Sequence, residues 1–178
     1  MATGNLQFCS ATPDNAGQLQ QLVQSAFRTE DSRQDWTGNV ELASHFRIEV
    51  EEVMAKIANP DIVTLMALDN NNTLVATIEV SKRGADCGRL SMIAVDDRYQ
   101  RGGVGRQVLA YAEDYCRQTW GAKKFSLNAL STRKALIEWY IRRGYWKTGE
   151  TSPFPRERFS NRALPDDICF VELEKDFN

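Results

Sequence analysis

The stretch LSMIAVDDRYQRGGVGRQVL, residues 90–109, decides the fold. Residues 90–95 are rich in β-forming side chains and predict a strand. Three glycines, Gly102, Gly103 and Gly105, then stand where a helix begins. The apolar stripe of this helix is formed by Val104, Val108, Ala112, Tyr115 and Cys116. The middle of the chain is therefore predicted to run from a strand, through a glycine-rich turn, into an amphipathic helix.

The glycine-rich turn predicts an anion-binding site. Glycine lets a backbone approach a ligand closely, because no Cβ intrudes. The first N–H groups of a helix lack intrahelical partners and lie at the positive end of its dipole. Such N–H groups bind phosphates and other anions. Arg101 and Arg106 flank the glycines and add formal positive charge.

Two nucleotide-binding motifs match the turn poorly. A P-loop would require Gly-Lys-Ser/Thr, which the turn lacks. A dinucleotide fingerprint requires GxGxxG, but Val108 follows Gly103-Val104-Gly105 where glycine or alanine is expected. The turn also follows a predicted hairpin instead of heading a βαβ unit. A further alternative is that the glycines only permit a tight turn and bind nothing.

Residues 90–109 resemble the acetyl-CoA-binding signature of the GNAT N-acetyltransferase superfamily. Gln100, Gly103 and Gly105 match its Gln/Arg-x-x-Gly-x-Gly/Ala pattern. The resemblance implies that the turn binds the pyrophosphate of coenzyme A, and that the preceding strand splays from its neighbour and pairs with the pantetheine arm. The cofactor-binding residues implied are Ile93, Ala94, Val95, Gln100, Arg101, Gly102, Gly103, Val104, Gly105 and Arg106.

A second motif, LSTRKALIEWYIRRGY, occupies residues 130–145 and resembles another part of the GNAT pattern. The matching residues are Ala135, Trp139, Tyr140, Gly144 and Tyr145. The resemblance places Tyr140 near the sulfur of the cofactor, as the acid that assists the departing thiolate. A free phenol has a higher pKa than a thiol, so full proton transfer would be uphill by roughly 2 kcal/mol. We therefore expect Tyr140 to donate a strong hydrogen bond to the thiolate. Taken alone, the stretch could equally be a buried helix capped by Ser131 or Thr132.

Two further side chains are candidates for the reaction. Glu79, on a predicted strand, could act as the general base that removes a proton from an ammonium substrate, although it could also be a solvated strand residue. Asn128, on the strand between the two motifs, is a candidate cofactor contact because family members often carry a polar residue nearby. A backbone N–H near residues 93–95 could stabilise the oxyanion.

The acceptor is expected to lie between two long, charged loops, residues 28–47 and 150–167, because the superfamily uses the corresponding loops. We select Arg33, Trp36 and Phe154 as substrate-binding candidates. Long loops often carry function, but charged loops can also be merely solvated. The stretches SRQDWT and GETSPFP resemble a GNAT subgroup, and this resemblance supplies no substrate.

The remaining elements follow from periodicity and turn residues. We predict strands at residues 6–11, 62–68, 73–80, 125–130, 145–148 and 168–173. One helix is expected to begin at Thr12. A second helix is expected to include Phe46 and to end at Asn59-Pro60. The loop before residue 90 carries Gly84 and Gly88, and Gly121 ends the helix after the glycine turn. We therefore predict one α/β domain over residues 1–178, with the GNAT fold: a mostly antiparallel mixed sheet of six or seven strands and about four helices.

Composition limits the possible functions. The chain has 178 residues and a net charge of −2, which fits one domain and argues against a strongly basic nucleic-acid footprint. No apolar run is long enough to span a bilayer, and no secretory signal is visible. The four cysteines are scattered without a CxxC pair, and His45 is the single histidine, so we expect reduced thiols and no metal. We expect a cytoplasmic monomer or homodimer that binds neither nucleic acid nor membrane.

The resemblance to the GNAT superfamily implies an acyltransferase. Acetyl-CoA is the expected co-substrate, and the acetyl group is expected to pass to a primary amine of a small molecule by direct attack in a ternary complex. Two alternatives remain open: a peptide or protein acetyltransferase that acts on N-termini or lysines, and a non-catalytic regulator that binds acyl-CoA. The sequence leaves the acceptor amine, the general base and the acyl-chain preference open.

Overall fold

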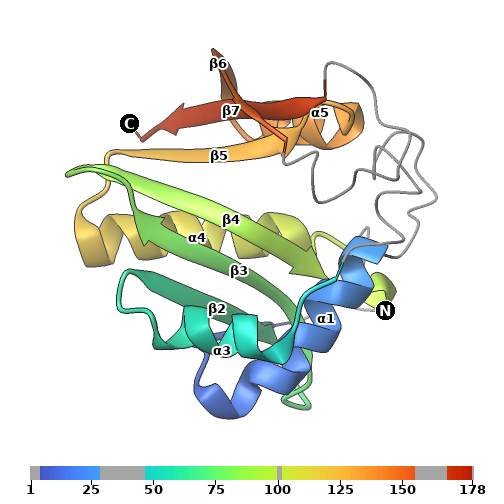
Figure 1. Ribbon diagram of the computed structural model, residues 1–178. Helices are drawn as coiled ribbons and strands as arrows, with labels where there is room; N and C mark the ends of the chain where they lie inside the picture. Colours follow the sequence, from blue (N-terminus) through green and yellow to red (C-terminus); the bar gives the residue numbers. More distant parts are fainter. Residues whose placement is uncertain (1–4, 29–46, 100–101, 155–167, 178) are drawn as a thin grey trace.

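A computed structural model describes residues 5–28, 47–99, 102–154 and 168–177 of the chain (Figure 1). The elements in chain order are β1 (Gln7–Ser10), the 3-10 turn η1 (Pro13–Asn15), α1 (Ala16–Arg28), α3 (Val50–Ala58), β2 (Ile62–Leu68), β3 (Leu74–Lys82), β4 (Cys87–Val95), the 3-10 turn η2 (Asp97–Tyr99), α4 (Val104–Trp120), β5 (Lys124–Leu130), α5 (Lys134–Arg142), β6 (Trp146–Pro153) and β7 (Cys169–Asp176). Strands and helices interleave, which confirms the predicted α/β class.

The strands form one seven-stranded sheet in the order β1-β2-β3-β4-β5-β7-β6. Every neighbouring pair is antiparallel except β4 and β5, which run parallel. This arrangement confirms the predicted mostly antiparallel mixed sheet. It also places α4, the helix after the glycine turn, in the crossover between the two parallel strands.

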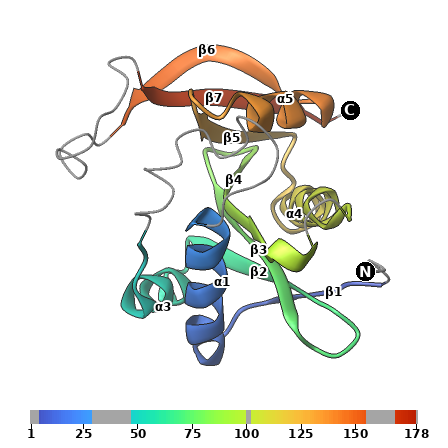
Figure 2. The same ribbon diagram turned by 90° about the vertical axis from the view of Figure 1, so that its right-hand side faces the viewer.

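Helices cover both faces of the sheet. Figure 2 shows α1 and α3 on one side of β3 and β4, and α4 on the other. The larger core lies on the α4 side and includes Ile78, Val80, Val108 and Tyr140. The smaller core lies on the α1 side and includes Ala94. Because Tyr140 of α5 belongs to the larger core, α5 packs together with α4.

The two parallel strands pair over only a short length. Their register comprises Cys87↔Lys124, Gly88↔Phe125 and Arg89↔Ser126, and the strands then diverge (Figure 1). We call the region beyond Arg89 the split. Its two sides are residues 90–95 of β4 and residues 127–130 of β5. The splayed strand predicted from the family resemblance is thus present.

A β-bulge lies on the β4 side of the split. Ser91 is opposite Glu79 of β3, whereas Ala94 is opposite Thr77, so β4 has one more residue than β3 over this interval. Met92 adopts a left-handed conformation with φ of 53°. Bulges bend a strand and increase its twist, which is consistent with the departure of β4 from β5 at this point.

Several predicted boundaries are confirmed. The strand predicted at residues 62–68 is β2, with the same bounds, and it forms the expected antiparallel hairpin with β3. The helix after the glycine turn begins at Val104, and Gly121 ends it with φ of 68°. Glycine adopts such positive φ values without the steric cost that a Cβ would impose.

Two predicted loops were wrong in part. Gly88 lies inside β4, and not in a loop; a Cβ at this position would lie 2.7 Å from the Cys116 sulfur, so glycine allows α4 to pack against the strand. The first residues of the predicted loop 150–167 belong to β6. This is the edge strand of the sheet, where a proline such as Pro153 is tolerated.

One predicted helix start is confirmed and another was wrong. Thr12 is the N-cap of the 3-10 turn η1, its N–H donates to Oδ1 of Asn15 over 2.8 Å, and η1 continues directly into α1 at Ala16. Helix α5 is preceded by Arg133 as its N-cap, instead of Ser131 or Thr132.

Helix α5 turns one face into the core. Leu136, Ile137 and Tyr140 are buried, whereas Ala135 and Trp139 are half-buried.

All four cysteines are free thiols. Among the described residues, no helix is long and apolar enough to cross a membrane, and no group of His, Cys, Asp or Glu is arranged to hold a metal ion.

Candidate active site at the split

The N-terminus of α4 follows the end of β4 and has features that favour anion binding at helix ends. Gly103 is its N-cap with φ of 81°, and no side chain in the described part of the chain caps it. The first turn of the helix carries no acidic residue. A Cβ on Gly103 would lie 3.6 Å from Nη2 of Arg106, so this guanidinium group is next to the helix end. Helix N–H groups and an arginine together favour negative charge here.

The glycines of the turn serve different purposes. A Cβ on Gly105 would make ordinary contacts with Trp139 of α5 at 3.7 Å and with Val95 of β4 at 3.8 Å. Gly105 therefore faces the protein, between α5 and β4, where there is room for a Cβ. The side chain of Val104 is buried in the core, so only its backbone could reach an anion. Close approach of a ligand to the backbone is then left to Gly102 and Gly103. Gln100 and Arg101 lie outside the described residues.

The segment before the glycine turn is held in place by a tyrosine. The Tyr99 hydroxyl donates to Oδ2 of Asp69, in the turn between β2 and β3, over 3.0 Å. Asp69 also accepts backbone N–H groups of Asn71 and Thr73. The pKa of Asp69 is lowered, and the hydrogen bond from the Thr73 N–H is the largest cause. This anchor was not predicted, because Asp69 and Tyr99 lie far apart in the sequence.

The β4 side of the split presents backbone rather than side chains. Ala94 is 3% exposed and its side chain packs toward α1. Ile93 and Val95 are half-buried and pack against the larger core. One edge of this segment pairs with β3, and its strand pairing with β5 ends at Arg89. The arrangement suits an extended ligand that lies along the other edge of β4.

Tyr140 lies on α5 within a group of aromatic rings. Its ring centroid is 5.3 Å from that of Trp139 and 5.9 Å from that of Tyr145. Burial raises the pKa of Tyr140 to about 12, against the opposing effect of Arg133. Transfer of its proton to an ordinary thiolate would then be uphill by ~5 kcal/mol. The environment therefore favours Tyr140 as a hydrogen-bond donor and strengthens the prediction that it does not ionise.

A hydroxyl group at the start of α5 is left without a partner. The Thr132 Oγ1 atom is buried and has no hydrogen-bond partner among the residues that the structure describes. Neighbouring Ser131 is engaged, because its hydroxyl accepts the N–H of Cys169 over 3.2 Å. Buried polar atoms without a partner are uncommon in folded proteins, and a bound water, ion or ligand can supply the partner. Thr132 was expected only as a helix cap.

Glu79 lies on β3, across β4 from the split. Its Oε2 is 3.2 Å from Nζ of Lys56 on α3, and its register partner on β4 is the exposed Ser91. Burial raises the pKa of Glu79, and the nearby Lys56 opposes that effect. A carboxylate with a raised pKa is a better general base near neutral pH. The structure does not join Glu79 to Tyr140, and its catalytic role stays a prediction.

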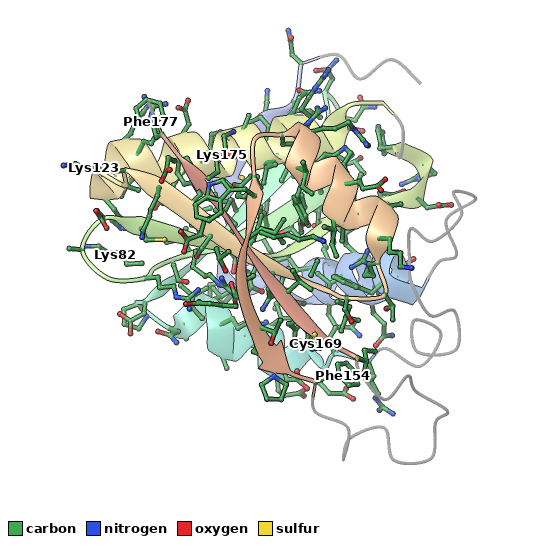
Figure 3. All side chains as sticks on the ribbon, turned by 90° about the horizontal axis from the view of Figure 1, so that it is seen from above. Lys82, Lys123, Phe154, Cys169, Lys175 and Phe177 are labelled. Carbon is green, nitrogen blue, oxygen red and sulfur yellow. The ribbon has the colours of Figure 1, made fainter. Side chains whose placement is uncertain are left out.

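The remaining predicted residues are more scattered. Asn128 of β5 is half-buried, lies opposite Glu172 of β7, and is adjacent to the buried Leu127 on the other face. Phe154 is buried, with its ring 5.9 Å from that of Phe170. Figure 3 shows Phe154 near Cys169, at one end of the β6–β7 pair. The two other substrate-binding candidates, Arg33 and Trp36, lie outside the described residues.

An ion pair lies where the split begins, at the last paired position of β4 and β5. Arg89 donates to both carboxylate oxygens of Glu172, over 2.7 Å and 3.1 Å, and to the Ser126 hydroxyl over 3.3 Å. Arg83 adds a longer contact of 3.6 Å to the same carboxylate. Burial raises the pKa of Glu172, but the two arginines outweigh it and hold the pKa below its usual range. We call Arg89, Ser126 and Glu172 the clasp, since they join β4, β5 and β7 at the last paired position.

Comparison with known proteins identifies the family of the chain. The pattern that describes the acetyltransferase (GNAT) family matches residues 22–145. This interval contains α4, the split and α5. No curated protein sequence matched the chain.

Solved structures share the fold across nearly the whole chain. One is the ribosomal-protein-S18-alanine N-acetyltransferase of Escherichia coli, with a TM-score of 0.70, 16% identity, and coverage of 98% of this chain and 95% of that one. Another is the PaiA N-acetyltransferase of Thermoplasma acidophilum in complex with coenzyme A; its TM-score is 0.66 at 15% identity, and the match covers 97% of this chain and 99% of that one. A candidate streptothricin acetyltransferase of Bacillus anthracis, in complex with acetyl coenzyme A, has a TM-score of 0.56 at 18% identity, and the match covers 70% of this chain and 67% of that one. At these identities the likeness establishes the fold alone.

Proposed function

The chain belongs to the acetyltransferase (GNAT) family, and from this premise we propose that it transfers an acetyl group from acetyl-CoA to a primary amine of a small molecule. The observation that carries the proposal is the α4 N-terminus beside the split: Gly103 leaves it without a side-chain cap from the described residues, and Arg106 lies next to it. A helix end of this kind binds phosphates, and coenzyme A carries a pyrophosphate.

In the proposed complex, the pyrophosphate binds the N–H groups that follow Gly102 and Gly103. The pantetheine arm lies along residues 93–95 of β4, where strand pairing with β5 has ended. This orientation directs the thioester toward α5 and Tyr140. Coenzyme A in the Thermoplasma structure and acetyl coenzyme A in the Bacillus structure support this class of ligand for the fold.

The proposed reaction is a direct transfer. The neutral amine attacks the thioester carbonyl carbon and a C–N bond forms; the attacking nitrogen then gives up a proton to solvent, and the C–S bond breaks to give the amide and the coenzyme A thiolate. Backbone N–H groups of β4 stabilise the oxyanion. Tyr140 donates a hydrogen bond to the thiolate that leaves, because its raised pKa keeps it protonated at neutral pH. The proton of the ammonium form passes to Glu79 or to an ordered water.

The described part of the acceptor side supports a ligand with an apolar portion. A small apolar cluster lies at the end of β5, directly after β6 and at the start of β7; it consists of Leu130, Phe154, Ile168 and Phe170. Arg133 at the start of α5 lies 5.9 Å from the ring of Phe27 on α1, which brings these two elements together at the open end of the split. We therefore include Phe154 in the proposed acceptor site.

An amine panel tests the proposal. Wild-type protein and Tyr140→Phe are incubated with acetyl-CoA and a set of small primary amines, and free coenzyme A thiol is measured. We expect thiol release with at least one small amine, and a lower turnover number for Tyr140→Phe. Peptides with free N-termini or lysines are included in the same panel. Release only with peptides would replace the proposed acceptor, and binding of acetyl-CoA without release would support a regulator.

A further inference from the structure

Three elements around the candidate site meet at one half-buried carboxylate. Glu113 of α4 accepts a hydrogen bond of 2.8 Å from the Tyr145 hydroxyl, directly after α5. Its two oxygens also accept Nζ of Lys175 on β7, over 3.1 Å and 3.2 Å. Figure 3 shows Lys175 where β7 passes α4. Glu113 therefore ties the end of α5 and the last strand to the middle of α4.

The charges in this cluster keep the tyrosine in its donor form. Burial raises the pKa of Tyr145 well above its usual range, and the charge of Glu113 and its hydrogen bond act in the same direction. The Lys175 ammonium lies 5.6 Å from the centroid of the Tyr145 ring, a favourable cation–π distance. Tyr145 is 2% exposed, so its hydroxyl depends on Glu113 for a partner.

Tyr145 is in direct contact with Tyr140. Its backbone N–H donates to the Tyr140 carbonyl over 3.1 Å, and the two rings meet edge-on at 5.9 Å. Between them, Gly144 has φ of 103°, and a Cβ there would lie 3.1 Å from Cε of Lys175. The turn thus brings Tyr145, and through it the end of α5, against Lys175 and Glu113.

Helix α5 is attached to α4 at a second point. Trp139 reaches the first turn of α4, where it lies 3.7 Å from the Cβ position of Gly105. Gly105 and Glu113 are separated by about 12 Å along the axis of α4. Along the chain, Tyr140 lies between the two residues that make these attachments, Trp139 and Tyr145. A helix held at two separated points cannot pivot about either one, so the position of Tyr140 relative to α4 is fixed.

We propose that Glu113 is a positioning residue that sets the Tyr140 hydroxyl relative to α4 through Tyr145. The inference rests on the proposed function. There, the phosphates of the cofactor are anchored on the N-terminus of α4, and the length of the pantetheine arm then determines where the sulfur lies. A hydroxyl that must meet this sulfur therefore needs a fixed position relative to the same helix, and the Glu113–Tyr145 hydrogen bond provides it.

Kinetics on matched variants test the functional part. Tyr145→Phe removes only the hydroxyl, Glu113→Ala removes its acceptor, and Glu113→Gln keeps an oxygen that can accept. Asp114→Asn is the control, since it breaks a 2.7 Å ion pair with Arg117 on the same helix. With an amine substrate from the panel, we expect kcat to fall about fivefold to tenfold in Tyr145→Phe and Glu113→Ala, with the KM for acetyl-CoA unchanged. Glu113→Gln should retain most of the turnover, and Asp114→Asn all of it.

The same changes in a Tyr140→Phe background separate positioning from general loss of structure. If Glu113 acts through the Tyr140 hydroxyl, Tyr145→Phe should cause no further fall in kcat in that background. A fall of the same size in both backgrounds would overturn the proposal.

Hydrogen exchange gives a readout that needs no acceptor amine and no turnover. The amide of residue 145, bonded to the Tyr140 carbonyl, should exchange about fivefold faster or more in Tyr145→Phe and Glu113→Ala. Its rate should be unchanged in Asp114→Asn. Unchanged exchange in both test variants would overturn the proposal, even if no amine in the panel proves to be a substrate. Failure of the proposed function, in contrast, appears as absent turnover in wild-type protein.

Discussion

The two ends of the β4–β5 pair treat polar groups differently. At the closed end, the clasp joins Arg89, Ser126 and Glu172 through short hydrogen bonds within the protein. At the open end, no side chain among the described residues caps Gly103, and the buried Thr132 hydroxyl has no partner among them. The polar groups at the closed end are therefore satisfied within the protein, whereas available ones lie in the segments that follow β4 and β5 at the open end.

This difference assigns different tasks to the two ends. Buried polar groups that bond one another fix a structure, and removal of one partner costs stability. Polar groups left without protein partners are available to a ligand or to water. We therefore expect substitutions at the closed end to change folding and leave cofactor affinity intact. Substitutions at the open end should do the reverse.

The largest expected effect is at Gly103. Asparagine and aspartate have the same shape, and both tolerate a positive φ better than most residues. We expect Gly103→Asp to bind acetyl-CoA about 100-fold more weakly than Gly103→Asn, because a carboxylate near the pyrophosphate adds repulsion of about 3 kcal/mol. Titration calorimetry measures both affinities. Aspartate at an N-cap stabilises a helix, so its unfolding temperature should not be lower. Equal affinities would exclude this helix end as the phosphate site.

At the closed end, Arg89→Met should lower the free energy of unfolding by about 3 kcal/mol, because Glu172 stays buried with one distant cation. The double variant Arg89→Met, Glu172→Leu should recover most of this loss. Urea unfolding measures the change, and acetyl-CoA affinity is the control. A weaker affinity in a folded Arg89→Met protein would show that the two ends are not separate.

Tyr140→Phe should reduce kcat by roughly 10- to 50-fold, corresponding to loss of one hydrogen bond to a developing charge. Neither the KM for acetyl-CoA nor the unfolding temperature should change appreciably. Steady-state kinetics with an identified amine provides the measurement. A decrease that appears in KM alone would place Tyr140 in cofactor binding instead of in the departure of the thiolate.

Acid should weaken the closed end. The pKa of Glu172 is lowered in the folded protein, so its contribution to stability is present above the usual glutamate pKa of about 4.3 and is lost as the pH falls below that value. Unfolding free energies measured from pH 7 to pH 3 should therefore decline less steeply in the double variant Arg89→Met, Glu172→Leu. Parallel declines in the two proteins would contradict the lowered pKa.

The smallest effect separates two glycines of the turn. Gly105→Ala should be neutral or stabilise by up to ~1 kcal/mol, because its Cβ makes ordinary contacts and alanine favours a helix. Gly103→Ala should destabilise by about 1 kcal/mol, because its φ is 81°. Thermal unfolding compares the two. Changes of the same sign would show that the turn relaxes on substitution.

Local signals in the sequence predicted much of the fold. A run of β-forming residues located β2, and helical periodicity located the body of α4. Gly103 and Gly121 marked the two ends of α4, where glycine permits a positive φ. The failures have local causes as well. Gly88 resembled a loop residue, although tight packing against Cys116 explains it. The prolines after residue 150 hid the last part of β6, which is an edge strand.

The candidate site was less accessible from the sequence. Individual residues indicated an anion at the glycine turn, but the split came only from the family resemblance. The clasp and the Glu113–Tyr145–Lys175 cluster were not predicted at all. Arg89 and Glu172 are 83 residues apart, and Glu113 and Lys175 are 62 apart. Single-chain periodicity carries no signal for such pairs, since they meet only when the sheet and α4 are assembled.

Hydrogen exchange with and without acetyl-CoA tests the central claim most directly. If the cofactor binds at the open end, amides in residues 91–95 of β4 and 104–107 of α4 should exchange more slowly in its presence. Amides in residues 87–89, at the closed end, and in β2 should be unaffected. Protection confined to the open end is the result that the proposed complex predicts. The proposed complex would be contradicted if saturating acetyl-CoA left residues 91–95 and 104–107 unprotected, or if it protected the closed end instead.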